Sequence, residues 1–437
     1  EKSKAEEVRE TSRETQPCWG QREMEGRIEL VLAGVAEMGR MNDDGVPELG
    51  KMMGRPVRYG GEFKGFEERA EGISKIASQS LQAIDAGEDA DFKRYIRRIP
   101  HGVVFVIAPW NYPYMTAINT IAPALIAGNT VILKHSTQTL LVGERLASAF
   151  HSAGVPKDVF QNVFLDHEIT TQLIAENSFD FINFTGSVPA GASIEKAAAG
   201  TFTGVGTELG GKDPGYVMED ADLEAAAETL IDGAMFNSGQ CCCGIERIYV
   251  QESLFNDFLK KAISIVSNYK LGNPLDMDTT LGPMANIRFA NHVRDQISDA
   301  QKKGAIAHIS TFQEDDGGVY LTPQILTNVD HSMKVMTEES FGPVVGIMPV
   351  KDDHEAISLM NDSEFGLTVS LWTRDLQRAI KIGDDIETGT VFLNRADYLD
   401  PALCWTGCKN TGRGGSLSEI GFHNLTRPKS YHLKKVT

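Results

Sequence analysis

Apolar and polar positions follow two different periods along this chain of 437 residues. In the first 90 residues, apolar side chains recur every three or four positions over 22–38 and 66–84, which predicts helices. From Gly102 onward, short continuous apolar runs alternate with segments of helical period. Strands that are apolar on both faces are typical of parallel sheets covered by helices. The pattern therefore predicts an α/β protein.

The expected elements form two successive α/β stretches, with a different segment before the first. In the first stretch, strands are expected at 102–108, 130–133 and 180–184, and helices at 138–153 and 188–199. In the second, strands are expected at 214–217, 247–250, 344–350 and 390–394, and helices at 223–236, 254–269 and 355–360. A polar break at Gly87-Glu88-Asp89 ends the helical region. The lysine- and arginine-rich segment 92–98 that follows is expected to be an exposed strand at an assembly edge.

Composition narrows the range of partners. The formal net charge is −18 and the pI is about 5.0, which opposes nonspecific binding to nucleic acid or to an anionic membrane surface. No apolar run approaches the roughly 20 residues that span a bilayer. Six cysteines fit a reducing compartment, so a cytoplasmic location is expected. The chain begins with Glu1 rather than Met, so a removed leader or terminal segment stays open as an alternative, and the location is an expectation only.

A run of three cysteines, Cys241-Cys242-Cys243, is the most unusual local feature. A disulfide between neighbours is sterically poor. Zinc-binding cysteines usually come in C-x2-4-C pairs with partners elsewhere, so no metal site is expected. The remaining cysteines are Cys18, Cys404 and Cys408. Two interpretations stay open for the run: three small buried apolar side chains, or a nucleophilic thiol.

Two other positions are candidates for holding a ligand. Lys134 ends an expected strand, at the carboxyl edge where open α/β sheets bind ligands. The segment 184–187 ends another strand just before a helix, whose free N-terminal amides suit a pyrophosphate. The glycines at Gly204 and Gly206 do not complete G-x-G-x-x-G, because Leu209 takes the place of the third glycine. Taken singly, each candidate also fits a solvated lysine or an ordinary turn.

Six segments, in this order, resemble the signature set of the aldehyde dehydrogenase superfamily. They are Pro109-Trp110-Asn111-Tyr112-Pro113, Lys134, Phe184-Thr185-Gly186-Ser187, Glu208-Leu209-Gly210-Gly211-Lys212, Asn237-Ser238-Gly239-Gln240-Cys241-Cys242 and Glu339-Ser340-Phe341-Gly342-Pro343. The resemblance spans about residues 15 to 437. It implies NAD(P)-dependent oxidation of an aldehyde to a carboxylic acid, on the hydrolytic branch of the family.

The resemblance also implies a domain arrangement. Residues 1–86 and 102–210 would form a Rossmann-like NAD(P)-binding domain, and 211–412 an α/β catalytic domain. Residues 87–101 and 413–437 would form a small β oligomerisation element. The terminal stretch 429–436 resembles the strand that family members add to a neighbouring subunit, which predicts a homodimer or homotetramer. Family members usually carry strand-forming sequence ahead of the position of Glu1, so an edge of the cofactor domain is expected to be missing.

The chemistry expected of the family can be assigned to three residues. Hydride leaves an aldehyde only from a tetrahedral adduct, and a thiolate supplies the nucleophile that forms it. The family's spacing selects Cys242, two positions after the motif's glutamine, with Asn111 as the oxyanion donor. Glu208 would be the base that activates water for thioester hydrolysis. Without the resemblance, an ordinary ion pair between Glu208 and Lys212 is the favoured interpretation.

Cofactor contacts carry over in the same way. The residues concerned are Trp110, Gly186 and Ser187 near the pyrophosphate, Lys134 and Glu339 at the two riboses, and Phe341 beside the nicotinamide. Thr137 replaces a glutamate that NAD-specific members often carry. Because this removes a carboxylate that would repel a 2′-phosphate, NADP is expected to be accepted as well as NAD. His135, when protonated, is expected to contribute.

The substrate pocket is expected to be aromatic. Its expected lining is Tyr112, Met115, Phe236, Cys241, Cys243 and Trp405, which favours an aromatic or medium-chain aliphatic aldehyde. Simple core packing is the alternative for the aromatic residues. No arginine stands among these positions, which argues against a substrate with a second carboxylate, although Thr116 and Asn119 offer hydrogen bonds.

Other functional classes stay open at this point. A semialdehyde dehydrogenase or an acylating, coenzyme A-dependent relative is the nearest alternative, although Glu208 favours hydrolysis. A noncatalytic binding protein is expected to lack Cys242 or Glu208. A thiol redox sensor has no need of Asn111, Lys134 and Glu339.

Overall fold

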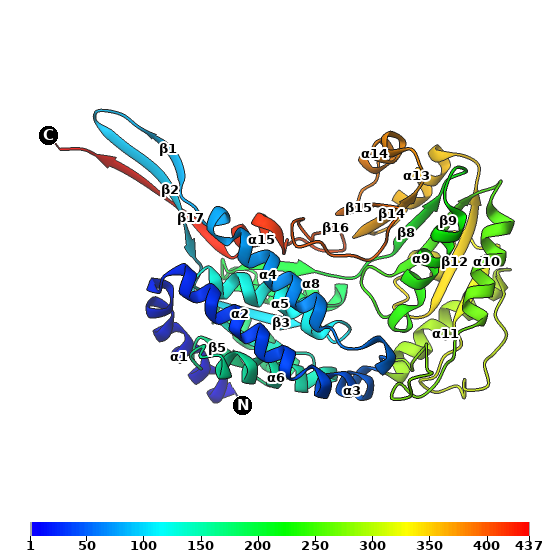
Figure 1. Ribbon diagram of the computed structural model, residues 1–437, viewed down its shortest axis with the longest axis horizontal. Helices are drawn as coiled ribbons and strands as arrows, with labels where there is room; N and C mark the ends of the chain where they lie inside the picture. The colour runs from blue at the N-terminus through cyan, green and yellow to red at the C-terminus, as the bar shows by residue number, and fades with distance from the viewer. Residues whose placement is uncertain (1, 437) are drawn as a thin grey trace.

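The computed structural model describes residues 2–436 and contains two parallel sheets with helices packed on them and a projecting antiparallel arm (Figure 1). The first sheet is wholly parallel and has the order β5-β4-β3-β6-β7. Its strands are β3 (Val103–Ala108), β4 (Thr130–His135), β5 (Phe160–Asn162), β6 (Phe181–Thr185) and β7 (Gly204–Glu208). The α/β class predicted from the apolar pattern is confirmed.

Helices cover this first sheet and fill the N-terminal part of the chain. They are α1 (Lys2–Gln21), α2 (Met24–Arg40), α3 (Asn42–Met53), α4 (Phe63–Ser80), α5 (Pro113–Ile126), α6 (Leu140–Ser152), α7 (His167–Ala175) and α8 (Val188–Ala198), with single 3-10 turns η1 (Val57–Tyr59) and η2 (Thr137–Thr139). The helix expected over 66–84 is present as α4, but its predicted C-terminal end was wrong. It ends at Ser80 because Ile84 pairs with Ile96 in a strand.

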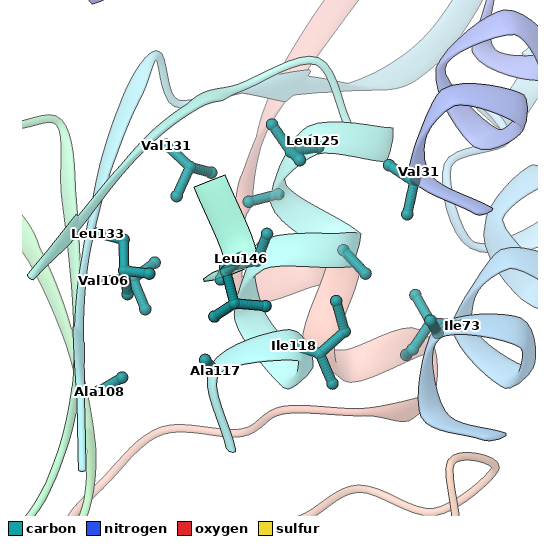
Figure 2. Packing of buried hydrophobic residues seen from close by; sticks show 14 of the residues in the cluster. Val31, Ile73, Val106, Ala108, Ala117, Ile118, Leu125, Val131, Leu133 and Leu146 are labelled. Atoms are coloured by element: carbon teal, nitrogen blue, oxygen red, sulfur yellow. The ribbon is translucent and has the colours of Figure 1, made fainter. Parts of the chain in front are cut away.

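A hydrophobic core joins these helices to the sheet (Figure 2). Val106 of β3 and Leu133 of β4 pack toward Ile118 of α5 and Leu146 of α6, and each is at most 2% exposed. Val31 and its neighbours on the outer helices close the same cluster. Because close-packed interiors resist deformation, this core fixes the strand ends that carry the functional residues.

The second sheet has seven strands in the order β10-β11-β12-β9-β8-β14-β15, all parallel except β10. The strands are β8 (Asp213–Val217), β9 (Ile245–Gln251), β10 (Ile306–Ala307), β11 (Gln324–Thr327), β12 (Val344–Val350), β14 (Thr368–Trp372) and β15 (Thr390–Leu393). Its helices are α9 (Leu223–Met235), α10 (Phe255–Ser267), α11 (Ile287–Lys302), α12 (Lys334–Thr337), α13 (Asp353–Asn361) and α14 (Leu376–Asp384), and the turn η3 (Phe236–Gly239) follows α9.

The arm is a three-stranded antiparallel sheet that projects from the body (Figure 1). It consists of β1 (Ile84–Glu88), β2 (Phe92–Pro100) and β17 (Thr426–Lys434). The strands expected at 92–98 and 429–436 are present as β2 and β17. The polar break expected at 87–89 was wrong in part, because Gly87 and Glu88 belong to β1 and the turn begins at Asp89, whose carboxylate accepts the N–H of Phe92.

Small elements complete the fold. The pair β13 (Phe365–Gly366) and β16 (Cys408–Lys409) lies in the second half of the chain, and α15 (Ser418–Asn424) leads into β17. None of the helices within residues 2–436 combines the length and the apolar character needed to cross a bilayer.

Candidate active site

Four of the sequence-predicted residues lie at one edge of the first sheet. Trp110, Lys134, Ser187 and Glu208 stand at or just after the carboxyl ends of β3, β4, β6 and β7. Along the chain, β4 and β5 are added on one side of β3, and β6 and β7 on the other. The order therefore reverses between β3 and β6, which is where open parallel sheets bind ligands.

The side chains at this edge suit a phosphorylated, polyhydroxyl ligand. Lys134 is 4% exposed, has no ion-pair partner within residues 2–436, and burial lowers the pKa of its ammonium group. Ser187 precedes α8 without a capping side-chain bond, so the first amides of that helix are available to an anion. Thr137 is exposed in η2. These residues fit a dinucleotide whose riboses and phosphates follow the edge.

His135 cannot make the contribution expected of it. Its ring is 2% exposed and contacts the carbonyl of Pro113 at 3.3 Å and the hydroxyl of Thr139 at 3.2 Å. Burial lowers the pKa of His135 to about 4, so the ring is neutral near pH 7. The expectation that a protonated His135 would meet a 2′-phosphate was wrong, because the strand end turns this side chain into the core.

The segment that carries Glu339 and Phe341 is anchored by a buried glutamate that sequence reasoning missed. Glu246 of β9 accepts the N–H groups of Ser340 and Phe341 at 2.8 and 2.9 Å, and pairs with Lys212 at 2.5 Å. Glu339 itself accepts the N–H of Gly211 at 3.2 Å, and burial raises its pKa to about 8. This carboxyl therefore lies against the glycine-rich turn.

That turn requires its glycines. A Cβ atom at Gly210 would lie 2.1 Å from a carboxylate oxygen of Glu339, and one at Gly211 would lie 2.7 Å from the carbonyl oxygen of Cys242. On the other side, Trp110 meets the ring of Phe341 edge-on at 5.5 Å and stacks on Phe289 at 5.2 Å. The glycines thus let the glutamate, the cysteine run and the aromatic cluster converge.

The backbone before the cysteine run is strained. Asn237, Ser238 and Gly239 have φ values of 55°, 56° and 68°, a region that non-glycine residues rarely adopt. The Asn237 amide donates to the carbonyls of Asn111 and Gln240 at 3.2 and 3.1 Å, and Ser238 donates to that of Gly282 at 2.7 Å. These bonds hold the conformation that presents the thiols.

Asn111 is fixed by a buried ion pair. The guanidinium of Arg55 donates to the Asn111 carbonyl at 2.5 Å and to Glu62 at 2.6 Å. The other oxygen of Glu62 accepts the first N–H groups of α5, from Tyr114 and Met115, each at 2.9 Å. Residues 2–436 contain no hydrogen bond to the Asn111 side-chain amide. The backbone is therefore held while the amide stays available.

The predicted pocket residues line one cavity of about 190 Å³. The lining includes Cys242 and Glu208 together with Tyr112, Met115, Phe236, Cys241, Cys243 and Trp405. Asn111 is not among the lining residues, and its backbone carbonyl accepts a hydrogen bond from the Asn237 amide. This volume is below the roughly 300 to 1,000 Å³ that accepts drug-sized ligands, which favours a small substrate.

The three thiols form a cluster. Their sulfur atoms all lie within 4.8 Å of one another, and those of Cys241 and Cys243 are 3.5 Å apart. Hydrogen bonds from its two neighbours lower the pKa of Cys241, and the same bonds raise the pKa of Cys242 and Cys243. These directions place the first thiolate of the cluster on Cys241, so the choice of Cys242 as nucleophile rests on its position and on motif spacing rather than on its own pKa. Cys241 and Cys243 are buried, whereas Cys242 is half-buried.

A structural zinc ion would need one more protein ligand than the three sulfurs of this cluster provide. Within residues 2–436, no His, Asp or Glu joins the three sulfurs at ligand distance. Structural zinc sites are almost always four-coordinate. The cluster is thus incomplete as a structural zinc site, even though its sulfurs are closer together than the spacing argument implied.

Glu208 is a buried carboxyl that forms no ion pair with any of residues 2–436. It is 8% exposed, and burial raises its pKa to about 7. The Ser416 hydroxyl acts in the opposite direction and lowers the pKa of Glu208. This effect is weak, because neither the Oγ of Ser416 nor the Oε1 of Glu208 has a well-formed hydrogen bond within the described chain. We therefore attribute the shift to burial. Lys212 pairs with Glu246 instead, so the ion pair between Glu208 and Lys212 that the sequence left open does not form.

One lining residue overturns an expectation about charge. Arg69 of α4 faces the cavity, where the sequence indicated no arginine. A signal was available, since Phe66, Arg69, Ala70 and Ile73 follow the helical period and all four are buried. A charged residue within an apolar stripe marks either a buried pair or a ligand contact.

Comparison with known proteins decides the family. The model of the aldehyde dehydrogenase family matches residues 1–431. The chain belongs to the aldehyde dehydrogenase family. This aldehyde dehydrogenase is 33% identical over 368 residues to succinate-semialdehyde dehydrogenase [NADP(+)] 1 of Mycobacterium bovis (strain BCG / Pasteur 1173P2), which covers 84% of the chain and 79% of the relative.

Two solved structures of similar fold contain a dinucleotide. NADP-dependent glyceraldehyde-3-phosphate dehydrogenase from Bacillus halodurans C-125, complexed with NADP, matches with a TM-score of 0.93 and 31% identity, over 99% of this chain and 92% of that one. The NAD+ complex of an aldehyde dehydrogenase from Bacillus cereus matches with a TM-score of 0.93 and 26% identity. The match covers 98% of this chain and 88% of that one. This aldehyde dehydrogenase is thus an NAD(P)-dependent oxidoreductase, as its sequence motifs predicted.

Proposed function

We propose that this aldehyde dehydrogenase oxidises a small aldehyde to its carboxylic acid through a covalent intermediate on Cys242. The observation that carries the proposal is that Cys242 and Glu208 line the same small cavity. One group supplies a nucleophile and the other a base with a pKa of about 7. A general base is most effective when its pKa is close to the working pH.

In the first half of the reaction, the Cys242 sulfur, once it has lost its proton, forms a bond to the aldehyde carbon, and the carbonyl oxygen becomes an oxyanion. Asn111 is the proposed donor to that oxyanion, because its amide has no competing partner within residues 2–436 and its backbone is held by Arg55. A preorganised donor of this kind is typically worth about 10²- to 10³-fold in rate. Bound NAD(P)+ supplies the hydride acceptor.

In the second half, the acyl group is a thioester on Cys242. Glu208 takes a proton from water, the water oxygen attacks the thioester carbon, and the bond from carbon to sulfur breaks. The acid then leaves and the thiolate is restored. The absence of an ion pair at Glu208 supports this role, because a salt-bridged carboxylate would be a much weaker base. An acylating reaction that uses coenzyme A remains the alternative.

Two substrate classes are compatible with the site. The aromatic side chains Tyr112, Phe236 and Trp405 favour an apolar aldehyde. The mycobacterial relative is named for succinate semialdehyde, which carries a carboxylate at its far end. The volume of the cavity favours short chains in either class.

The test is NAD(P)H formation at 340 nm with pentanal and with succinic semialdehyde, using NAD and NADP in turn. We expect C242A to lose at least about 10³-fold in kcat, whereas C241A and C243A, the matched controls, keep measurable turnover. E208Q is expected to give a burst of one NAD(P)H per chain and then stall. Equal activity of C242A and wild type would refute the covalent mechanism. Rescue of E208Q by coenzyme A would indicate that the site also supports acyl transfer.

A further inference from the structure

The cavity contains a buried cation that the proposed chemistry does not use. Arg69 is 8% exposed and lines the cavity beside Cys242 and Glu208. It forms no ion pair within residues 2–436, although Glu208 and the thiols lie close enough to affect it electrostatically. Burying a guanidinium without a counterion is costly. A buried guanidinium of this kind is expected to have an anionic partner.

None of the neighbouring acidic groups within residues 2–436 forms an ion pair with Arg69. Glu62 is the carboxylate that most strongly raises the pKa of Arg69. It is already bonded to Arg55 and to two backbone N–H groups. Besides Arg69, the charged groups of the lining are Glu208 and Asp397. Asp397 is exposed and forms no ion pair with Arg69. No carboxylate of residues 2–436 therefore lies within ion-pair distance of this guanidinium, although Glu62 and Glu208 act on it from further away.

Arg69 lines the cavity and keeps two of its donor atoms unbonded within residues 2–436. Its Nη1 donates to the carbonyl of Met115 at 2.8 Å and contacts the amide oxygen of Asn119 at 3.4 Å. These two bonds to α5 fix the guanidinium plane. Neither Nε nor Nη2 has an acceptor among the described residues. Two parallel N–H donors on a planar fork match a carboxylate.

We propose that Arg69 binds the far-end carboxylate of a short aliphatic aldehyde, so that the substrate is an ω-carboxyl aldehyde of about three to five carbons. The proposal rests on the function proposed above, since it uses the same cavity. The apolar wall of Tyr112, Met115 and Phe236 contacts the methylene chain, and the guanidinium receives the anion. The free donors of Arg69, rather than the aromatic wall, then determine specificity.

The test compares succinic semialdehyde with pentanal, a neutral aldehyde of similar length, in wild type, R69Q, R69K and K75Q. The readout is the ratio of the two kcat/KM values, which cancels any general loss of activity. A charge-assisted hydrogen bond corresponds to about 10- to 100-fold in this ratio. We expect R69Q to lower the ratio by that factor through KM for the semialdehyde, and R69K to restore part of it. Lys75 lies on the same helix but is exposed, so K75Q should leave the ratio unchanged.

A binding measurement separates this proposal from the catalytic one. Calorimetric titration with succinate and with butyrate should show tighter binding of succinate to wild type, and R69Q should abolish the difference. Oxidation of pentanal with an unchanged ratio in a folded R69Q would overturn the role of Arg69 and leave the proposed function standing. If neither aldehyde is oxidised but succinate binding depends on Arg69, the proposed function fails and the anion site is supported. Equal binding of succinate and butyrate to wild type would also overturn the anion site.

Discussion

Glu208 combines two properties of a catalytic base, burial and a free carboxylate oxygen, and its environment has a consequence for pH dependence. A base acts only in its ionised form. With a pKa of about 7, the ionised fraction rises from about a tenth at pH 6 to about nine-tenths at pH 8.

We therefore expect the rate of thioester hydrolysis to rise about tenfold between pH 6 and pH 8 and to level off above. The burst phase reports acylation, so its amplitude should stay near one NAD(P)H per chain while the following steady-state rate changes. Stopped-flow measurement across this range separates the two phases. E208Q should lose the dependence near pH 7 in the steady state. A flat profile in wild type would show that another group provides the base.

Single residues also mark where sequence reasoning reached its limit. The roles assigned to Cys242 and Glu208 depended on motif spacing, and the structure places both side chains on one cavity. The orientation of His135 was not readable, because adjacent positions of a strand point to opposite sides and both sides here are covered. Arg69 was missed because its neighbours in space, Met115 and Asn119, are about 50 positions away in the sequence.

At the scale of elements, Glu62 connects the start of α4 to the start of α5. It receives two backbone N–H groups of α5 and the guanidinium of Arg55, and both members of the ion pair are buried. Removing one member of a buried pair leaves an uncompensated charge, which typically costs about 3 to 5 kcal/mol. The strands and helices around it were predictable from local period, but this connection was not, since it depends on tertiary contacts.

We expect E62Q to be destabilised by about 3 kcal/mol or more, measured as the midpoint of denaturant unfolding. Because Arg55 also holds the Asn111 carbonyl, kcat should fall in a variant that still folds. The double variant R55M/E62L removes both charges and should be more stable than E62Q. The exposed pair of Arg94 and Asp89 offers the matched control, and D89N should leave the midpoint of denaturant unfolding close to that of the wild type. An E62Q protein as stable as wild type would contradict this account.

At the scale of the whole molecule, the arm carries a strand edge that pairs with no other strand of the described residues. In the order β1-β2-β17, one long edge of β17 is unpaired, and most of the strand is exposed. Exposed edges pair readily with further strands. Tyr95 and Tyr431 stack at 4.5 Å and stiffen the arm. We infer that the arm joins two copies of the chain.

Light scattering of the full chain, of mass 47.8 kDa, should give a mass of two or four chains. A chain that ends after Pro428 loses most of β17 and should run as a monomer with unchanged far-UV circular dichroism. A chain that ends after Lys434 keeps the strand and is the control. An oligomer of unchanged size in the shorter variant would show that another surface is responsible.

Because the three sulfur atoms lie close together, chemical modification does not distinguish which of them is the nucleophile. All three lie within 4.8 Å of one another and face the same cavity. An alkyl group placed on any one of them would fill the space in front of the other two. Loss of activity on treatment with iodoacetamide, and protection by substrate, would therefore look the same whichever sulfur had reacted. In this protein chemical labelling alone is ambiguous, and only substitution of the cysteines one at a time can single out the reacting sulfur.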